Sequence, residues 1–206
     1  MSDRMNFDNS NPLAAILSFT MPADKAAEAT ETLLSKYGTL GTMLSENEDE
    51  LSSSGNINMN TVLLIKLLGY INSRRVTDNF EFGKAHGELE ICEYIRSLFY
   101  GISVETVYLI LLDEKGRVTG CEYMGEGTVN ASDVYPRKLL ECAVKKKAKS
   151  VILAHNHPKG MAEPSREDIA TTKRLCEIFL TAKIRLLAHY IAADGDIQKI
   201  DTGIFF

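Results

Sequence analysis

Apolar residues return every three or four positions through the first third of the chain. Across residues 12–75 this spacing places alanine, leucine and isoleucine on one face of successive helices. The second helix is expected to end near Gly38, because glycine commonly follows a helix terminus. A short helical piece begins at Leu40, residues 52–56 form a turn, and a last helix follows. The pattern predicts a small all-helical unit.

The pattern changes in the second half, where β-favouring runs alternate with helical ones. Residues 106–112 are continuously apolar, which is typical of a strand buried on both faces. The pair Lys115-Gly116 then marks a hairpin turn. Further strands are expected over residues 118–124, 151–154, 184–192 and 197–200, with helices over residues 88–100, 135–147 and 165–182. We therefore expect an α+β / α/β fold class, in which a mixed sheet has flanking helices.

The two patterns indicate two domains, and 206 residues suffice for one ordinary domain and a small second one. A polar tail is expected over residues 1–11, ahead of the helical unit of residues 12–75. A segment with little periodicity, residues 76–85, is expected to link this unit to a mixed-sheet domain of residues 86–206.

Composition narrows the class of protein. Hydrophobic residues make up 45% and charged residues 25%, which argues against disorder, and a net charge of −5 argues against a surface that binds nucleic acid throughout. No signal peptide is recognisable, and the apolar runs are too short for a bilayer, so we expect a cytoplasmic protein without membrane contact. Widely spaced cysteines predict reduced thiols rather than disulfides or a cysteine zinc site: Cys92, Cys121, Cys142 and Cys176.

The candidate chemistry follows the expected strand of residues 151–154. His155 and His157 are two residues apart, so in an extended backbone both side chains reach the same point. Asp168 lies in the first turn of the next expected helix, after a loop long enough to fold back. Two imidazoles and one carboxylate, with the fourth position left to water, match a catalytic site for one zinc ion.

Two other interpretations of these residues stay open at this point. A histidine near a strand end is often a hydrogen-bonded structural residue. Ser165 and Asp168 also suit the N-cap and N3 positions of a helix, although such a cap would hold Asp168 in place for a metal. Two lookalikes are excluded: residues of HNH nucleases are not adjacent, and zinc deaminases require a PCxxC segment that this chain lacks.

The arrangement His155-x-His157, ten intervening residues and Asp168, with Pro158 and Ser165 in place, resembles the JAMM motif of MPN-type metalloprotease domains. The sequence around this motif resembles the RadC branch of that family over residues 84–206. Its segments are Ala154-His-Asn-His-Pro-x-Gly160, Pro164-Ser-x-x-Asp168-Ile-x-x-Thr171, Gly127-Thr128-Val129 and Tyr135-Pro136-Arg137.

The resemblance implies further roles. JAMM domains carry a glutamate at the start of a buried strand, and Glu105 matches that position as the base that moves a proton. Ser165 matches the residue that donates a hydrogen bond to the developing oxyanion. Glu122 and Glu126 are the rival bases by residue type alone. RadC-like domains commonly carry Asp-His where this chain has Ala188-His189, so His189 is either a neighbour of the metal ligands or a core residue.

The resemblance implies a zinc-dependent metallohydrolase that cleaves peptide or isopeptide bonds of a protein or peptide substrate. The alternative is a non-catalytic module, associated with nucleic acid and DNA repair or with another protein, that keeps a residual metal site. A metal-dependent nuclease is a third possibility, because activated water also attacks phosphodiesters. Glu105 distinguishes these hypotheses. A base beside an open metal position is needed for catalysis, but a non-catalytic module does not require one.

The sequence has few features that would indicate a nucleic-acid site. The N-terminal segment of RadC proteins, which residues 12–75 resemble, typically contains a hairpin with Gly-x-Gly, but this chain has only Gly55 there. Residues 145–149 hold four lysines, which favour a solvated helix end over a nucleic-acid site. His86 lies in the expected linker and is assigned no role.

Overall fold

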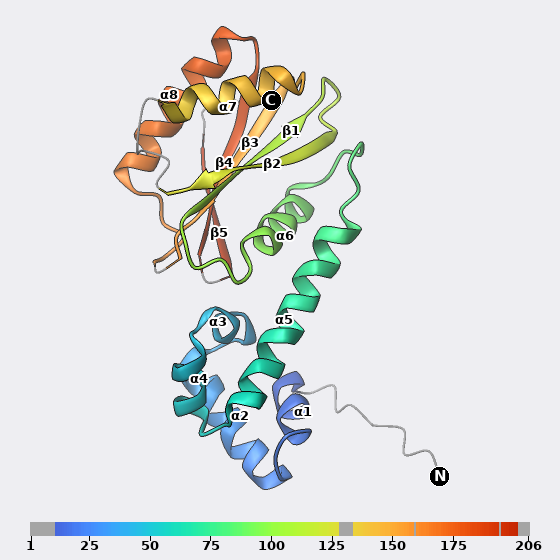
Figure 1. The fold of residues 1–206 in the computed structure, drawn as a ribbon, viewed down its shortest axis with the longest axis vertical. Coiled ribbons are helices and arrows are strands. Elements are labelled where there is room, and N and C mark those ends of the chain that lie inside the picture. Colours follow the sequence, from blue (N-terminus) through green and yellow to red (C-terminus); the bar gives the residue numbers. More distant parts are fainter. Residues whose placement is uncertain (1–10, 128–133, 159, 194, 202–206) are drawn as a thin grey trace. The chain divides into compact units, whose positions relative to one another are not determined.

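The computed structural model describes residues 11–127, 134–158, 160–193 and 195–201. The chain divides into two compact units, Met1–Asn72 and Ser73–Phe206 (Figure 1). None of the helices in the described part combines the length and the apolar character that crossing a bilayer requires.

The first unit is helical, as predicted. Asn11, Thr39 and Asn47 cap three of its helices by accepting backbone N–H groups through their side chains. Apolar residues of α1, α2, α3, α4 and α5 bury one core, in which Leu17, Leu33 and Leu51 are inaccessible to solvent. Its elements are α1 (Pro12–Ser18), α2 (Ala23–Tyr37), α3 (Leu40–Ser45), α4 (Glu48–Gly55) and the part of α5 (Met59–Asn79) up to Asn72; the rest of α5 belongs to the second unit.

Two local expectations for this unit were wrong. Residues 52–55 belong to α4 rather than to a turn, because the cap at Asn47 and the burial of Leu51 hold the serine run in helical form. The chain turns instead at Asn56, where φ is 47°. Residues 76–79 of the expected linker are the last turn of α5. Of the expected tail, residues 1–10 lie outside the described residues.

The second unit has a mixed five-stranded sheet in the order β2-β1-β3-β4-β5, which is the α+β architecture predicted from the sequence. β3 and β4 are parallel, and the other neighbouring strands are antiparallel. The strands are β1 (Thr106–Leu112), β2 (Val118–Glu126), β3 (Ser150–Asn156), β4 (Arg185–Ala193) and β5 (Asp196–Ile200). The helices are α6 (Glu88–Phe99), α7 (Val134–Lys145) and α8 (Arg166–Thr181).

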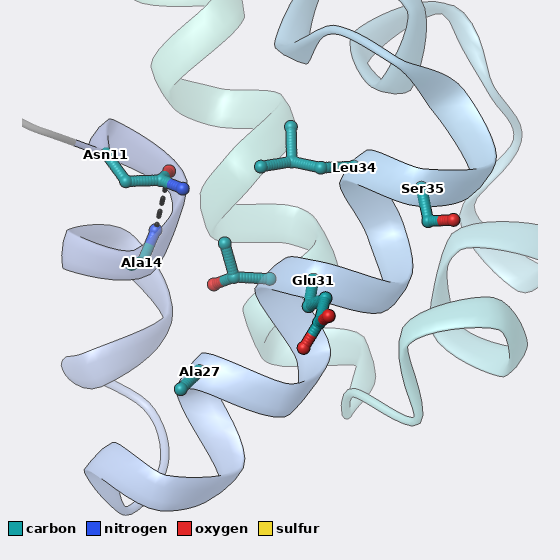
Figure 2. A pocket seen from close by; sticks show the side chains of 7 residues that line it. Asn11, Ala14, Ala27, Glu31, Leu34 and Ser35 are labelled. Atoms are coloured by element: carbon teal, nitrogen blue, oxygen red, sulfur yellow. Dashed lines mark hydrogen bonds between the residues drawn. The ribbon is translucent and has the colours of Figure 1, made fainter.

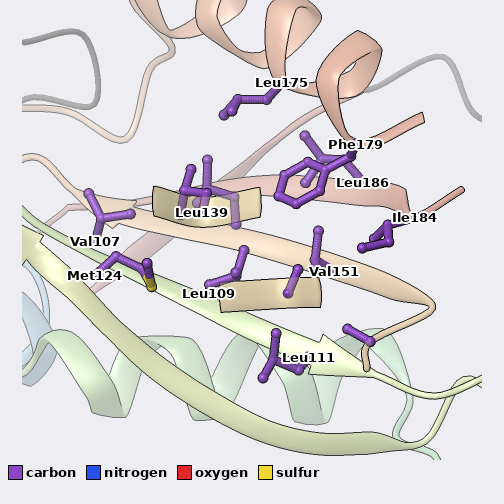
Figure 3. Close-up of a cluster of buried hydrophobic side chains, with 13 residues drawn as sticks. Val107, Leu109, Leu111, Met124, Leu139, Val151, Leu175, Phe179, Ile184 and Leu186 are labelled. Atoms are coloured by element: carbon purple, nitrogen blue, oxygen red, sulfur yellow. The ribbon is translucent and has the colours of Figure 1, made fainter. Parts of the chain in front are cut away.

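Helices cover both faces of this sheet: α7 and α8 lie on one face and α6 on the other (Figure 1). Because side chains alternate along a strand, β1 sends Val107, Leu109 and Leu111 towards α7 and α8, where Phe179 fills the core (Figure 3). Ile110 and Leu112 point towards α6. β1 and β3 are therefore apolar on both faces.

The register places the end of β3 beside three other segments. Val107 of β1 lies opposite His155 of β3 in the antiparallel pair. On the other side, the backbone N–H of His157 donates to the carbonyl oxygen of Ala192 at 2.8 Å, which extends the pairing with β4. The loop after β3 leads to the N-terminus of α8. Functional side chains in α/β structures commonly gather at such a carboxyl edge of parallel strands.

Candidate metal centre

Three side chains meet at the end of β3, as the sequence predicted. His155 Nε2 lies 3.0 Å from His157 Nε2 and 3.3 Å from Asp168 Oδ1, and His157 Nε2 lies 3.4 Å from Asp168 Oδ2. The extended backbone of β3 sends both imidazoles to one face, and the first turn of α8 supplies the carboxylate. In the described part of the chain, this group is the one set of histidine, cysteine and acidic side chains placed to hold a metal ion.

The spacing of these atoms fits a tetrahedral ion. Zinc–nitrogen and zinc–oxygen bonds of about 2.0–2.1 Å place tetrahedral ligand atoms roughly 3.3 Å apart. The two imidazole nitrogens are 3.0 Å apart, and their distances of 3.3 and 3.4 Å to the two different oxygens of the Asp168 carboxylate are of the same size, so the group suits one small divalent cation. The side chains of His155 and Asp168 are 0% and 4% exposed, whereas that of His157 is 23% exposed, so the group reaches solvent through His157.

His157 is oriented by the loop that follows it. Its Nδ1 lies 3.1 Å from the carbonyl oxygen of Met161. A carbonyl oxygen only accepts, so Nδ1 carries the hydrogen and the lone pair stays on Nε2, which faces the other two side chains. The loop thereby prepares His157 as a metal ligand.

Asp168 is held by the start of α8. The backbone N–H and the hydroxyl of Ser165 both donate to Asp168 Oδ2, at 2.9 and 2.6 Å, and the Asp168 N–H donates to Ser165 Oγ at 3.0 Å. Burial by itself would raise the pKa of Asp168, but the hydrogen bonds from His155 and Ser165 and the charge of His155 hold it well below its ordinary value. The cap thus keeps an ionised carboxylate beside the two imidazoles.

Ser165 therefore uses its only hydroxyl hydrogen on Asp168 in this structure. The oxyanion role implied by the resemblance stays a proposal. It requires this hydrogen to turn from Asp168 towards the substrate.

Glu105 lies directly before β1. Two residues further along the chain, Val107 of β1 lies opposite His155 of β3. Burial and, after it, the negative charge of Glu105 raise the pKa of Tyr135 in α7. The charge of Glu105 therefore acts on α7, the helix that packs on the face of the sheet towards which β1 sends Val107.

The rival glutamates are placed differently. Glu122 lies opposite Leu109, further along the sheet from His155, and forms an ion pair with Lys146 at 2.5 Å. Glu126 lies on β2 opposite Thr106, one strand further from β3 than Glu105. His86 is also remote from the cluster, because its Nε2 bonds the carbonyl oxygen of Glu81 and its ring stacks on Phe80.

Asn156, between the two histidines, ties β3 to the start of β1. Its Oδ1 accepts the backbone N–H of Thr106 at 2.7 Å, and its Nδ2 donates to the carbonyl oxygen of Val104 at 3.2 Å. These two partners flank Glu105 in the chain. Asn156 therefore clamps the backbone that carries Glu105 against the strand that carries His155. No role of Asn156 is predicted from the sequence, because a clamp between segments 50 residues apart leaves no local pattern.

We expect Asn156→Ala to lower the free energy of unfolding by about 1–3 kcal/mol, because it leaves the buried N–H of Thr106 without its acceptor. Urea denaturation of the full chain measures this change. Asn79→Ala is the matched control, since Asn79 is exposed in the same unit. Equal unfolding midpoints for the two variants would contradict the clamp.

A cavity in the first unit offers no comparable chemistry. It lies between α1 and α2 (Figure 2), and Glu31 is the one charged residue in its lining. The side chain of Asn11 at its rim is engaged with the N–H of Ala14 at 3.3 Å. The lining residues are Asn11, Ala14, Ala27, Thr30, Glu31, Leu34 and Ser35.

Comparisons with known proteins show which family this chain is similar to. A family model described as a RadC-like JAB domain matches residues 86–200, a range that contains all of the residues above from Glu105 to His189. The chain is 31% identical over 186 residues to UPF0758 proteins of Aliivibrio salmonicida strain LFI1238 and Aliivibrio fischeri strain MJ11, covering 90% of this chain and 83% of each relative. It is also 31% identical over 175 residues to a UPF0758 protein of Vibrio atlanticus strain LGP32, covering 82% of this chain and 76% of the relative.

Proposed function

This chain belongs to the RadC family, and on that premise we propose that it is a zinc-dependent metallohydrolase that cleaves peptide or isopeptide bonds. The observation that carries the proposal is the convergence of His155 Nε2, His157 Nε2 and the Asp168 carboxylate, with access to solvent at His157. Two imidazoles and one carboxylate leave a fourth position open, which is the ligand count of a catalytic zinc site.

The donor set and its surroundings favour zinc. Imidazole nitrogen suits zinc, whereas magnesium and calcium prefer ligand sets made of oxygen. The carbonyl oxygen of Met161 holds the far side of the His157 ring, and Ser165 holds the Asp168 carboxylate at Oδ2, as the outer partners of metal ligands generally do. Bound zinc supplies a Lewis acid that brings the pKa of water close to neutrality.

Glu105 is proposed as the base. It accepts a proton from the attacking water and later delivers that proton to the leaving nitrogen. An amine is a poor leaving group until it is protonated. Cleavage of an amide bond therefore needs a side chain that carries a proton to the leaving nitrogen, whereas metal binding by itself does not. Ser165 is proposed to donate a hydrogen bond to the oxyanion that develops on the carbonyl oxygen.

The resemblance to JAMM domains supports a protein or peptide substrate, and a nucleic acid is the alternative partner. Of the four lysines at residues 145–149, Lys146 is paired with Glu122 and Lys145 is the last residue of α7. Both positions agree with the solvated helix end expected from the sequence. We also propose a cytoplasmic location, which is supported by the four cysteines: all lie in the described part of the chain and are free thiols.

A substrate panel tests the proposed function. The full chain, loaded with one equivalent of zinc, is incubated separately with a fluorogenic peptide library, a library of lysine ε-amide isopeptides, and single- and double-stranded DNA. We expect cleavage of an amide library that stops with 1,10-phenanthroline and returns with added zinc, and no cleavage of DNA. If only DNA is cleaved, and the cleavage depends on zinc, the protein is a nuclease rather than a peptidase. Cleavage that continues undiminished after the chelator is added would refute the metal chemistry.

A further inference from the structure

His189 occupies the centre of a buried hydrogen-bonded chain behind the metal centre. It lies on β4 and is inaccessible to solvent. Its Nε2 is 2.8 Å from His155 Nδ1, and its Nδ1 is 2.6 Å from the hydroxyl of Thr172 on α8. Thr172 Oγ1 is in turn 2.6 Å from the carbonyl oxygen of Asp168. His189 and Thr172 thus connect the three elements β3, β4 and α8 behind the proposed metal ligands.

The hydrogen positions in this series of hydrogen bonds follow from its last acceptor, the carbonyl oxygen of Asp168. The carbonyl oxygen of Asp168 only accepts, so the single hydroxyl hydrogen of Thr172 lies between these two oxygens. Thr172 Oγ1 must then accept from His189 at the second contact. His189 therefore carries its hydrogen on Nδ1 and, as a neutral imidazole, presents the lone pair of Nε2 to His155.

That lone pair determines how His155 meets a metal. A coordinating imidazole gives up any hydrogen on the coordinating nitrogen and keeps one N–H on the other. His155 Nε2 faces His157 and Asp168, so the remaining hydrogen lies on Nδ1 and needs an acceptor in a fully buried place. His189 Nε2 is that acceptor at 2.8 Å, but only while His189 holds its own hydrogen on Nδ1.

We propose that Thr172 and His189 form a hydrogen-bonded relay that selects the tautomer of His155 and so prepares Nε2 to bind the metal. His189 and Thr172 are positioning residues in this scheme, because they act through His155 and touch neither metal nor substrate. The inference rests on the proposed metal site but adds residues outside it. Removing one such outer partner typically weakens metal binding by about 10–100-fold.

Position 172 allows a matched test. Thr172→Ser keeps the hydroxyl that orients His189, whereas Thr172→Val keeps the shape and removes the hydroxyl. We expect zinc affinity, measured by competition with a chromophoric chelator, to stay within about twofold of the parent in Thr172→Ser and to fall by about 10-fold or more in Thr172→Val. Equal affinities for these two variants, both shown to be folded by circular dichroism, would overturn the relay.

Position 189 gives a second, independent pair. His189→Gln retains an acceptor in reach of His155 Nδ1, whereas His189→Leu fills the space without one. We expect weaker zinc binding for His189→Leu than for His189→Gln by about 10-fold or more, and the reverse order would contradict the relay.

A spectroscopic readout separates this inference from the proposed function. Nitrogen-15 NMR of the metal-free protein reports which ring nitrogen of His189 is protonated, and it requires neither zinc nor a substrate. We expect the Nδ1–H form in the parent and in Thr172→Ser, and loss of this preference in Thr172→Val. An Nε2–H form of His189 in the parent would refute the relay even if the enzyme is active, whereas a correct tautomer in a protein without hydrolytic activity would refute only the proposed function.

Discussion

Replacing Glu105 with glutamine is expected to lower the turnover of any hydrolysed substrate by roughly 10²–10⁴-fold, which is the usual contribution of a positioned proton-transfer group. Glutamine has nearly the same shape but cannot accept the proton of the attacking water. The backbone should stay in place, because the carbonyl oxygen of Glu105, rather than its side chain, accepts the N–H of Gly127 at 2.8 Å. Zinc content should also stay unchanged, since Glu105 is not among the three converging side chains.

The measurement combines steady-state kinetics with metal analysis of the same preparation. Glu122→Gln and Glu126→Gln are the matched controls, because both residues are glutamates of the neighbouring strand β2. We expect both controls to keep the activity of the parent. Undiminished turnover in Glu105→Gln, or a loss of the same size in a control, would refute the assignment of the base.

The second large effect concerns the metal itself. The double variant His155→Ala, His157→Ala removes two of three protein ligands and is expected to reduce bound zinc from about one equivalent to a trace, as measured by inductively coupled plasma mass spectrometry after dialysis. The remaining carboxylate of Asp168 cannot hold zinc alone, because zinc in proteins requires three or four such ligands. Zinc retained by the folded double variant would refute the metal site and, with it, the proposed hydrolase.

His86→Ala provides the control for this experiment. His86 is the one histidine of the chain outside the buried cluster, since it bonds the carbonyl oxygen of Glu81 and stacks on Phe80. Its removal should leave zinc content unchanged. His157→Ala alone is the milder variant for stability, because the His157 side chain is 23% exposed whereas His155 is fully buried. A cavity left at His155 is expected to cost more folding stability than the change at His157.

Local patterns carried much of the prediction. The continuous apolar run Thr106–Leu112 is a strand with these bounds, and glycine at position 38 follows the end of α2 at Tyr37. The two-residue spacing of His155 and His157 allowed a shared ligand point, and the resemblance to the JAMM motif made the convergence with Asp168 the expected one. The strand and the helix end are local features, so periodicity and helix-end chemistry were enough to find them.

Other features escaped because they depend on packing. The serine run at residues 52–54 has the composition of a turn, yet a capped start and the buried Leu51 hold it in α4. Gly55 then lies where an added side chain would come within 3.0 Å of Leu33, a contact between two helices that no local rule reveals. Tertiary contacts of this kind override weak intrinsic preferences.

The sequence by itself determined the order of strands and helices in the second unit, because local periodicity marks each of these elements. Its resemblance to the JAMM motif singled out the three side chains that could hold a metal. Only the tertiary structure decided what surrounds these side chains. Asn156 reaches Thr106 across 50 residues, and His189 reaches His155 across 34. Such partners meet only when the strand register and the crossover through α8 are formed. A buried polar group needs a hydrogen-bond partner, and the tertiary structure decides which atom lies within reach.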